Sequence, residues 1–105
     1  MRADELHPQA QALLDELDSA EMEPLHELSP QRARERAAAM RSGGGPAVGA
    51  VEDRTLDGPG GDLPVRIYRP EGDGPAPTVV HFHGGGWVVG DLDGSEQFCR
   101  HLCLA

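Results

Sequence analysis

Near the start of the chain, apolar residues recur with the period of an α-helix in two stretches. Pro8 suits a first helical position, and the apolar residues after it share one helical face: Ala10, Leu13, Leu14 and Leu17. This spacing predicts a helix over residues 8–19. A second helix is predicted from Pro30 to Arg41, with Ser29 as its N-cap and a run of glycines after its end. Its apolar face is thin, so we expect it to pack weakly.

Beyond residue 50 the apolar positions follow the two-residue period of β-strands. Residues 51–56 and 63–68 are short β-prone runs separated by a segment rich in turn residues. In the second run, apolar residues at 63, 65 and 67 alternate with Pro64, Arg66 and Tyr68. This alternation predicts one buried face and one wet face, and a hairpin is the simplest connection between the two strands.

The stretch from Thr78 to Phe82 is apolar on both faces except at His81, which predicts a strand buried inside a sheet. Three glycines follow it. Ser95 is then expected to cap a last helix, whose apolar residues share one face: Phe98, Cys99, Leu102 and Cys103. The predicted order of elements is therefore helix, helix, linker, hairpin, buried strand, loop and helix.

The composition narrows the range of partners and compartments. The chain has 18 acidic and 9 basic residues, a net charge of −9, so we expect neither nucleic acid nor an anionic membrane as a partner. No apolar run is long enough to span a bilayer, and the first residues contain no apolar signal region. The expectation is a cytoplasmic protein, in which Cys99 and Cys103 are small buried apolar residues rather than a disulfide.

The segment from His83 to Trp87 is the strongest candidate for chemistry. It joins the predicted buried strand to three consecutive glycines, Gly84, Gly85 and Gly86, and ends on an aromatic residue. Glycine is needed where the backbone takes a positive φ or approaches another group closely. Such a corner leaves backbone N–H groups free to receive the negative charge that develops on an oxygen during acyl transfer. The pattern therefore predicts an oxyanion hole.

Other interpretations of this region stay open. The glycines can form a plain flexible turn, or a phosphate-binding loop ahead of a helix, although the spacing matches neither GxxxxGK[ST] nor GxGxxG. His81 and His83 alternate as metal ligands on a strand do, but no further ligands follow at a recognised spacing, so no metal site is predicted. Asp91 and Asp93 lie beside glycines and are interpreted as turn and helix-entry residues.

Five short segments form a recognisable set: VRIYRP at 65–70, PTVV at 77–80, HGGGW at 83–87, GDL at 90–92 and CR at 99–100. Together they resemble the hormone-sensitive-lipase-like (HGGG-motif) family of α/β-hydrolase esterases and lipases. The resemblance implies the N-terminal part of an α/β-hydrolase fold: cap helices, an antiparallel strand pair, the strand that carries the oxyanion loop, and the first helix that flanks the sheet.

The same resemblance implies roles for individual residues. The N–H groups of Gly85 and Gly86 are the expected oxyanion donors, while Gly84 permits the close turn. His83 is expected to hold the loop by a hydrogen bond. Trp87 either lines the substrate mouth or is a core aromatic residue. The resemblance implies no metal or organic cofactor, and a small-molecule ester as the substrate.

The catalytic triad of such an enzyme is missing from these residues. The fold carries its serine on a GxSxG elbow, followed along the chain by an acid and a histidine. None of the serines lies in such a pentapeptide: Ser19, Ser29, Ser42 and Ser95. We therefore expect the chain to supply the oxyanion loop of a carboxylic-ester hydrolase and to be inactive by itself. A truncated non-catalytic protein, or the anion-binding module considered above, is the alternative.

The sequence also predicts how the chain is divided. Residues 1–42 are expected to form cap helices, residues 43–50 a Gly/Pro-rich linker, and residues 51–105 the start of an incomplete hydrolase core. The strand predicted at 78–82 lacks neighbours that would cover its open edge. Self-association through that edge is a further expectation.

Overall fold

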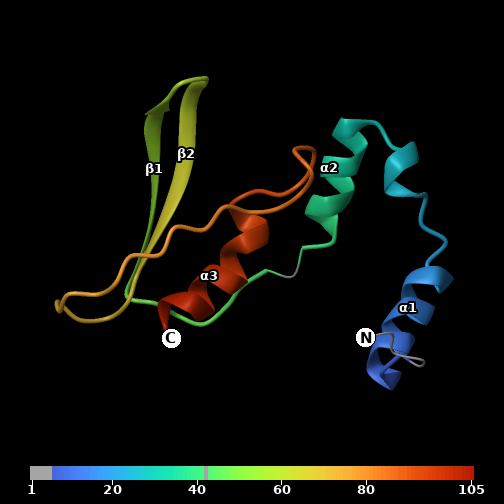
Figure 1. The fold of residues 1–105 in the computed structure, drawn as a ribbon, viewed down its shortest axis with the longest axis horizontal. Helices are drawn as coiled ribbons and strands as arrows, with labels where there is room; N and C mark the ends of the chain where they lie inside the picture. The colour runs from blue at the N-terminus through green and yellow to red at the C-terminus, as the bar shows by residue number, and fades with distance from the viewer. Residues whose placement is uncertain (1–5, 42) are drawn as a thin grey trace.

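A computed structural model of the chain describes residues 6–41 and 43–105, and its elements follow the predicted order (Figure 1). The elements are α1 (Pro8–Ser19), the short 3₁₀ helix η1 (Leu25–Glu27), α2 (Pro30–Ala39), β1 (Ala50–Gly58), β2 (Gly61–Arg69), the 3₁₀ helix η2 (Asp93–Ser95) and α3 (Glu96–Cys103). The two predicted N-terminal helices are confirmed. None of the helices in the described part of the chain has the length and apolarity to cross a membrane.

Local capping explains why α1 and α2 begin where they do. Each has proline in its first turn, where the missing N–H costs no helical hydrogen bond. At α2, the Ser29 hydroxyl accepts a hydrogen bond from the backbone N–H of Arg32 at 3.3 Å. At α1, Nδ1 of His7 accepts from the N–H of Gln9, also at 3.3 Å. These contacts satisfy N–H groups that the first turn of a helix leaves free.

The predicted hairpin is confirmed, with longer strands and a tighter turn. β1 and β2 pair antiparallel from Ala50 opposite Arg69 to Gly58 opposite Gly61, so only Pro59 and Gly60 form the loop. Gly61 adopts a φ of 117°, which glycine tolerates without steric cost. The turn-rich segment between the predicted strands is thus largely absorbed into the ladder.

The predicted alternation of one buried and one wet face along β2 is wrong. Leu63, expected to be buried, is 52% exposed, whereas residues 65–68 are all half-buried, and the Arg66 side chain, expected to be wet, is only 16% exposed. Two contacts cover the face of Arg66 and Tyr68: α3 packs on β2, and the guanidinium of Arg100 lies 6.0 Å from the centre of the Tyr68 ring. Burial raises the pKa of the Tyr68 hydroxyl. Carboxylates that neutralise Arg66, described below, allow a charged residue to occupy the covered face.

The strand predicted from Thr78 to Phe82 does not form within the described residues. No helix or strand is assigned between Arg69 and Asp93, and the segment runs across the molecule toward α2 (Figure 1). Val80 is 71% exposed and Phe82 86% exposed, so the expected burial is also wrong here. A strand is defined by its hydrogen-bonded neighbour, and β1 and β2 pair only with each other. The apolar sequence is present, but no partner lies beside it.

The last helix is confirmed, but Ser95 does not cap it. Ser95 has helical backbone angles, and its side chain makes no cap hydrogen bond because η2 leads directly into α3. His81, within the strand predicted to be buried, is exposed and has its ring 4.9 Å from the ring of Phe98. The segment before β1 lies against α3, where Arg100 donates to the carbonyl of Pro46 at 3.2 Å.

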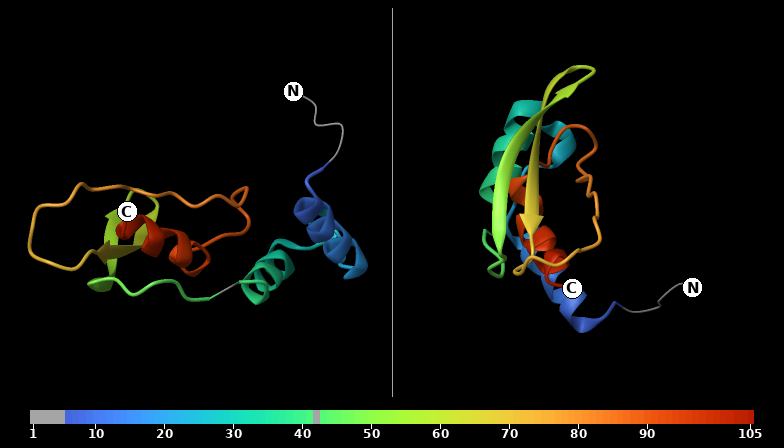
Figure 2. Two further views of the ribbon diagram at one scale, coloured as in Figure 1. Left: turned by 90° about the horizontal axis from the view of Figure 1, so that it is seen from below. Right: turned by 90° about the vertical axis from the view of Figure 1, so that its left-hand side faces the viewer.

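The elements form two groups with little shared interior. Figure 2 shows the hairpin, α3 and the long connection at one end of the molecule, with α1 and α2 at the other. Among the described residues only Ala33 is buried. The accessible surface is 8889 Å² for an 11.2 kDa chain, whereas a compact protein of this mass exposes about 5,700 Å². The radius of gyration, 17.7 Å, likewise exceeds the value of about 13 Å typical of a compact domain of this length.

Too little apolar surface is covered to stabilise this arrangement by itself. We expect the 105-residue chain in isolation to be poorly ordered or associated, with no sharp thermal unfolding transition. Circular dichroism during heating, combined with sedimentation velocity, measures both properties. A monomer that unfolds cooperatively contradicts this prediction.

Candidate functional site

The glycine loop, defined as residues 83–90, is a closed turn whose backbone requires glycine. The N–H groups of Val88 and Val89 both donate to the carbonyl of Gly85, at 3.1 and 3.0 Å. Gly85 has a φ of 137°, and a Cβ atom at this position would lie 1.7 Å from the carbonyl oxygen of Val89. No other residue fits at position 85 unless the turn opens.

The two ends of the glycine loop also touch. A Cβ atom at Gly90 would lie 2.3 Å from the carbonyl oxygen of Gly84 and 2.7 Å from Nδ1 of His83. The His83 ring nitrogen is 2.9 Å from the Gly84 carbonyl oxygen, a hydrogen bond when that nitrogen carries its proton. His83 and Gly90 thus close the base of the loop, and the structure adds Gly90 to the glycines that the sequence singled out.

The backbone at the tip of the loop leaves its donors free. Gly86 and Trp87 both adopt a φ of 58°, in the left-handed region. Within the part of the chain that the structure describes, the N–H groups of Gly85 and Gly86 have no protein acceptor. They border a hollow of about 470 Å³ lined by Arg34 and all of the glycine loop. Free N–H groups on a preset backbone are the donors that oxyanion stabilisation needs.

Trp87 lies at the rim of this hollow and is not a core residue here. Its side chain is fully exposed, at 101%. A non-glycine residue in the left-handed region costs roughly 1–2 kcal/mol, so the surrounding turn must hold Trp87 there. Of the two roles considered for this tryptophan, its exposure favours the substrate mouth.

Helix α2 and the residues just after it contact the glycine loop and the residues that follow it, at points that the sequence analysis missed. Nε of Arg34 on α2 donates to the carbonyl of Val88 at 2.7 Å. Arg41, beyond the end of α2 at Ala39, forms ion pairs with Asp91 and, at 3.4 Å, with Asp93. These contacts were missed because the helix was judged only by its apolar residues.

Arg66 joins the hairpin to the exit of the glycine loop. Its guanidinium makes a two-point pair with Asp53 on β1, at 2.6 and 3.0 Å, and a bond to Asp93 at 2.9 Å. Glu96, in the first turn of α3, lies 3.9 Å away. The hydrogen bond from Arg66 is the main cause that lowers the pKa of the Asp53 carboxyl. Its bonds to Asp53 and Asp93 raise the pKa of Arg66, so the guanidinium stays charged.

Asp91 and Asp93 have the structural roles expected of them. Oδ1 of Asp91 accepts a hydrogen bond from the N–H of Gly94 at 2.8 Å, which forms the turn into η2. Both carboxylates are neutralised by Arg41, and Asp93 also by Arg66. Over the described ranges, no group of three or more His, Cys, Asp or Glu residues is arranged to hold a metal ion.

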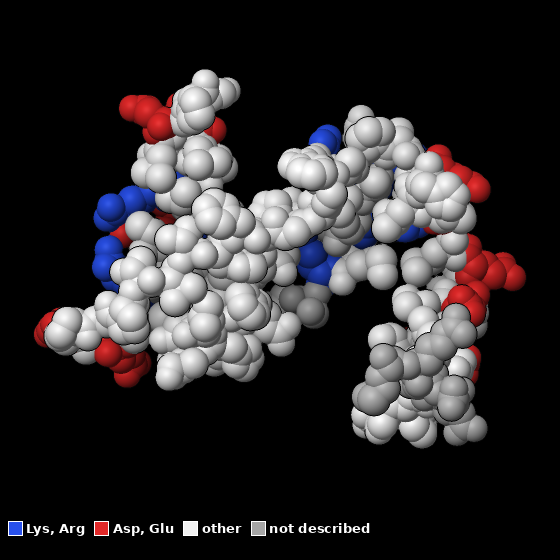
Figure 3. Space-filling model, in the orientation of Figure 1, with Lys and Arg blue, Asp and Glu red and all other residues white. Residues whose placement is uncertain are grey.

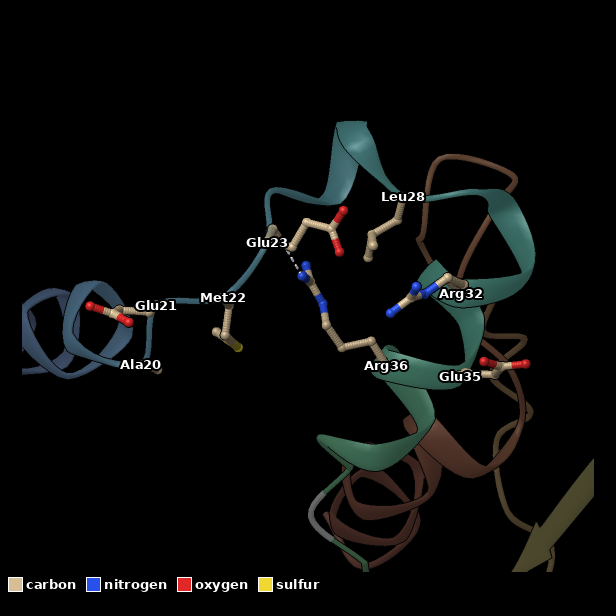
Figure 4. A pocket seen from close by; sticks show the side chains of 8 residues that line it. All are labelled: Ala20, Glu21, Met22, Glu23, Leu28, Arg32, Glu35 and Arg36. Carbon is tan, nitrogen blue, oxygen red and sulfur yellow. Dashed lines mark hydrogen bonds between the residues drawn. The ribbon is translucent and has the colours of Figure 1, made fainter.

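A second hollow, of about 430 Å³, lies between the end of α1 and the face of α2 (Figure 4). Arg36 donates to the carbonyl of Glu23 across it. Its lining mixes both signs of charge with apolar residues: Ala20, Glu21, Met22, Glu23, Leu28, Arg32, Glu35 and Arg36. It shares no residue with the hollow at the glycine loop and contains no free nucleophile.

Comparison with known proteins places the chain among esterases. Carboxylic ester hydrolase LipN of Mycobacterium tuberculosis is 49% identical over 53 residues, which are 50% of this chain and 14% of that protein. Ethyl acetate hydrolase of Pseudomonas putida is 37% identical over 86 residues, covering 75% of this chain and 27% of the relative. No family model matches the chain.

A solved structure agrees over nearly the whole chain. The ester-hydrolase EH1AB1 from the metagenome of Lake Arreo superposes with a TM-score of 0.84 and 31% sequence identity, covering 93% of this chain. The match covers 34% of that hydrolase, so the chain spans about a third or less of the length of these three proteins.

The Arg66 network can be tested in a chimera in which this chain replaces the matching segment of ethyl acetate hydrolase. In this chimera, Arg66→Gln is expected to lower the free energy of unfolding by about 1 kcal/mol, since it leaves Asp53 without its cation and Asp93 paired with Arg41 alone. The matched control is Arg54→Gln, because Arg54 pairs with Glu52 on the same strand and is 52% exposed. We expect a smaller loss there. Equal losses in the two variants contradict a special role for Arg66.

The stability that Arg66 contributes to the chimera is expected to depend on pH. The folded-state pKa of Asp53 is lowered, so its contact with Arg66 stabilises the fold above the unfolded pKa of about 3.9 and is lost as the pH falls through the folded value. The stability gap between the chimera and its Arg66→Gln variant should therefore be constant above about pH 5 and shrink below pH 4. Chemical denaturation at a series of pH values measures it.

The glycine motif, the fold and the similar proteins all point to the same protein family. The HGGGW segment forms the closed loop, the structural match extends over both the helical and the hairpin parts, and the similar proteins are ester hydrolases. The chain belongs to the hormone-sensitive-lipase-like family of α/β-hydrolase esterases, of which it forms an N-terminal portion.

Proposed function

We propose that this chain supplies the oxyanion hole of a carboxylic-ester hydrolase that works through a serine acyl-enzyme. The observation that carries the proposal is the glycine loop, where free N–H groups of Gly85 and Gly86 border a hollow within a turn whose position 85 only glycine can occupy. Gly84 precedes this turn and carries the carbonyl against which Gly90 closes. In this proposal the two N–H groups bind the carbonyl oxygen of the ester as it becomes negatively charged.

The other site residues have supporting roles in the same proposal. His83 holds the base of the loop through the Gly84 carbonyl and is not the catalytic base. Trp87 borders the entrance for the substrate. No residue of the chain is assigned as nucleophile, acid or base, because no serine here lies on a GxSxG elbow. Those steps belong to the remainder of a complete hydrolase, and they need no metal or organic cofactor.

The proposal also covers the organisation of the chain. Residues 1–42 form a cap whose second helix contacts the glycine loop, residues 43–50 link it to the core, and residues 51–105 begin the core. The substrate is a small-molecule ester. The relatives' names mention ethyl acetate and other carboxylic esters, which supports this substrate class.

The chimera tests the proposed function directly. We expect it to hydrolyse a short-chain p-nitrophenyl ester, while the isolated 105-residue chain gives no turnover above buffer because it has no nucleophile. Steady-state assays with and without a serine-directed phosphonate measure both. A folded chimera without activity argues against the proposal, and so does phosphonate-sensitive hydrolysis by the isolated chain.

A single substitution tests the oxyanion assignment. Gly85→Ala in the chimera forces a Cβ atom against the Val89 carbonyl and moves the donors, so kcat should fall about 100- to 1000-fold with a smaller change in KM. The matched control is Gly74→Ala, because a Cβ atom there meets no neighbour. Circular dichroism confirms that both variants fold. Near-parental kcat in folded Gly85→Ala would show that the glycines form only a turn.

A further inference from the structure

The hollow at the glycine loop contains one charged side chain, that of Arg34. The rest of its lining is the loop itself, residues 83–90, which includes no aspartate or glutamate. The chain as a whole has a net charge of −9, so a hollow with a cation and no carboxylate differs from the general surface. In Figure 3 basic side chains lie around α2 and along the outer flank of the hairpin, while acidic ones lie at the tip of the hairpin and near α1.

Arg34 differs from the arginines that hold the fold together. Arg41, Arg54, Arg66 and Arg100 each pair with a carboxylate. Arg34 pairs with none among residues 6–41 and 43–105, and its Nε–H donates to the Val88 carbonyl. A guanidinium has five N–H donors in a planar fork, so one bond to a carbonyl leaves the terminal donors for a ligand.

We propose that this hollow binds esters that carry a carboxylate near the scissile bond, and that Arg34 recognises that carboxylate. The inference rests on the proposed function and specifies its substrate class. The Val88 bond fixes the guanidinium beside the loop, where the free N–H groups of Gly85 and Gly86 are proposed to receive the ester oxygen. A planar guanidinium binds a carboxylate through two parallel hydrogen bonds, which orients the ester as well as attracting it.

Two esters of the same shape, one with a carboxylate and one neutral, can distinguish carboxylate recognition by Arg34 from a role of Arg34 in positioning the loop. Monoethyl succinate carries a carboxylate where ethyl isocaproate carries an isopropyl group. The chimera is assayed with both esters, and the quantity measured is kcat/KM for monoethyl succinate divided by kcat/KM for ethyl isocaproate. A residue that only holds the loop changes both values alike and leaves the ratio unchanged.

Two variants of Arg34 and one matched control decide the outcome. Arg34→Gln keeps an N–H for the Val88 carbonyl but removes the charge, so the ratio should fall about tenfold. Arg34→Lys keeps the charge and should retain most of the ratio. The control is Arg32→Gln, on the same helix but lining the hollow between α1 and α2. The control should leave the ratio unchanged, and added salt should lower the ratio only when position 34 is charged.

Binding without turnover gives a second measurement. It is made by isothermal titration calorimetry on the chimera with its catalytic serine replaced by alanine, so that no ester is hydrolysed. Monoethyl succinate should bind saturably, ethyl isocaproate should bind more weakly, and Arg34→Gln should remove the difference between the two esters. An unchanged kcat/KM ratio in Arg34→Gln, or equal binding of the two esters if the chimera is inactive, overturns the proposal. Loss of activity toward both esters in the unsubstituted chimera counts instead against the proposed function.

Discussion

The structure depends on one guanidinium placed among three carboxylates. Arg66 is the point where β1, the exit of the glycine loop and α3 meet, through Asp53, Asp93 and Glu96. Almost no apolar interior holds these parts together, since Ala33 is the single buried residue among those described. Polar pairs at partly exposed positions contribute little individually. Shared by several segments, they determine which segments lie next to one another, and hence where the glycine loop lies.

Local signals in the sequence predicted the local structure well. The proline and serine that begin α2 act within one turn, and the hairpin needs only a tight turn and two β-prone runs. The glycine loop was likewise predictable, because three consecutive glycines favour a tight turn with positive φ angles. What the sequence could not provide was the environment of each face. The stretch from Thr78 to Phe82 has the composition of a buried strand, but burial requires partners that lie outside this chain's own sheet.

The contacts missed by sequence analysis are all distant along the chain. Arg34 and Val88 are 54 residues apart, and Arg41 and Asp91 are 50 apart. An arginine on an exposed helix face gives no sign of which carbonyl or carboxylate it will meet, since the pattern of charges there is that of any solvated helix. Ser95 illustrates the opposite error: it has the residue type of an N-cap, but a preceding 3₁₀ turn already supplies helical geometry. Residue type indicates what a position can do, and the neighbours decide whether it does so.

The bonds from α2 to the glycine loop have a mechanical consequence. Because Arg34 on α2 holds Val88 and Arg41, just after α2, holds Asp91, these two bonds lie on either side of the loop's closing glycine, Gly90. A movement of α2 away from the loop therefore either breaks these bonds or moves the loop with the helix. Under the proposed function, uncovering the hollow would also disturb the N–H groups that border it.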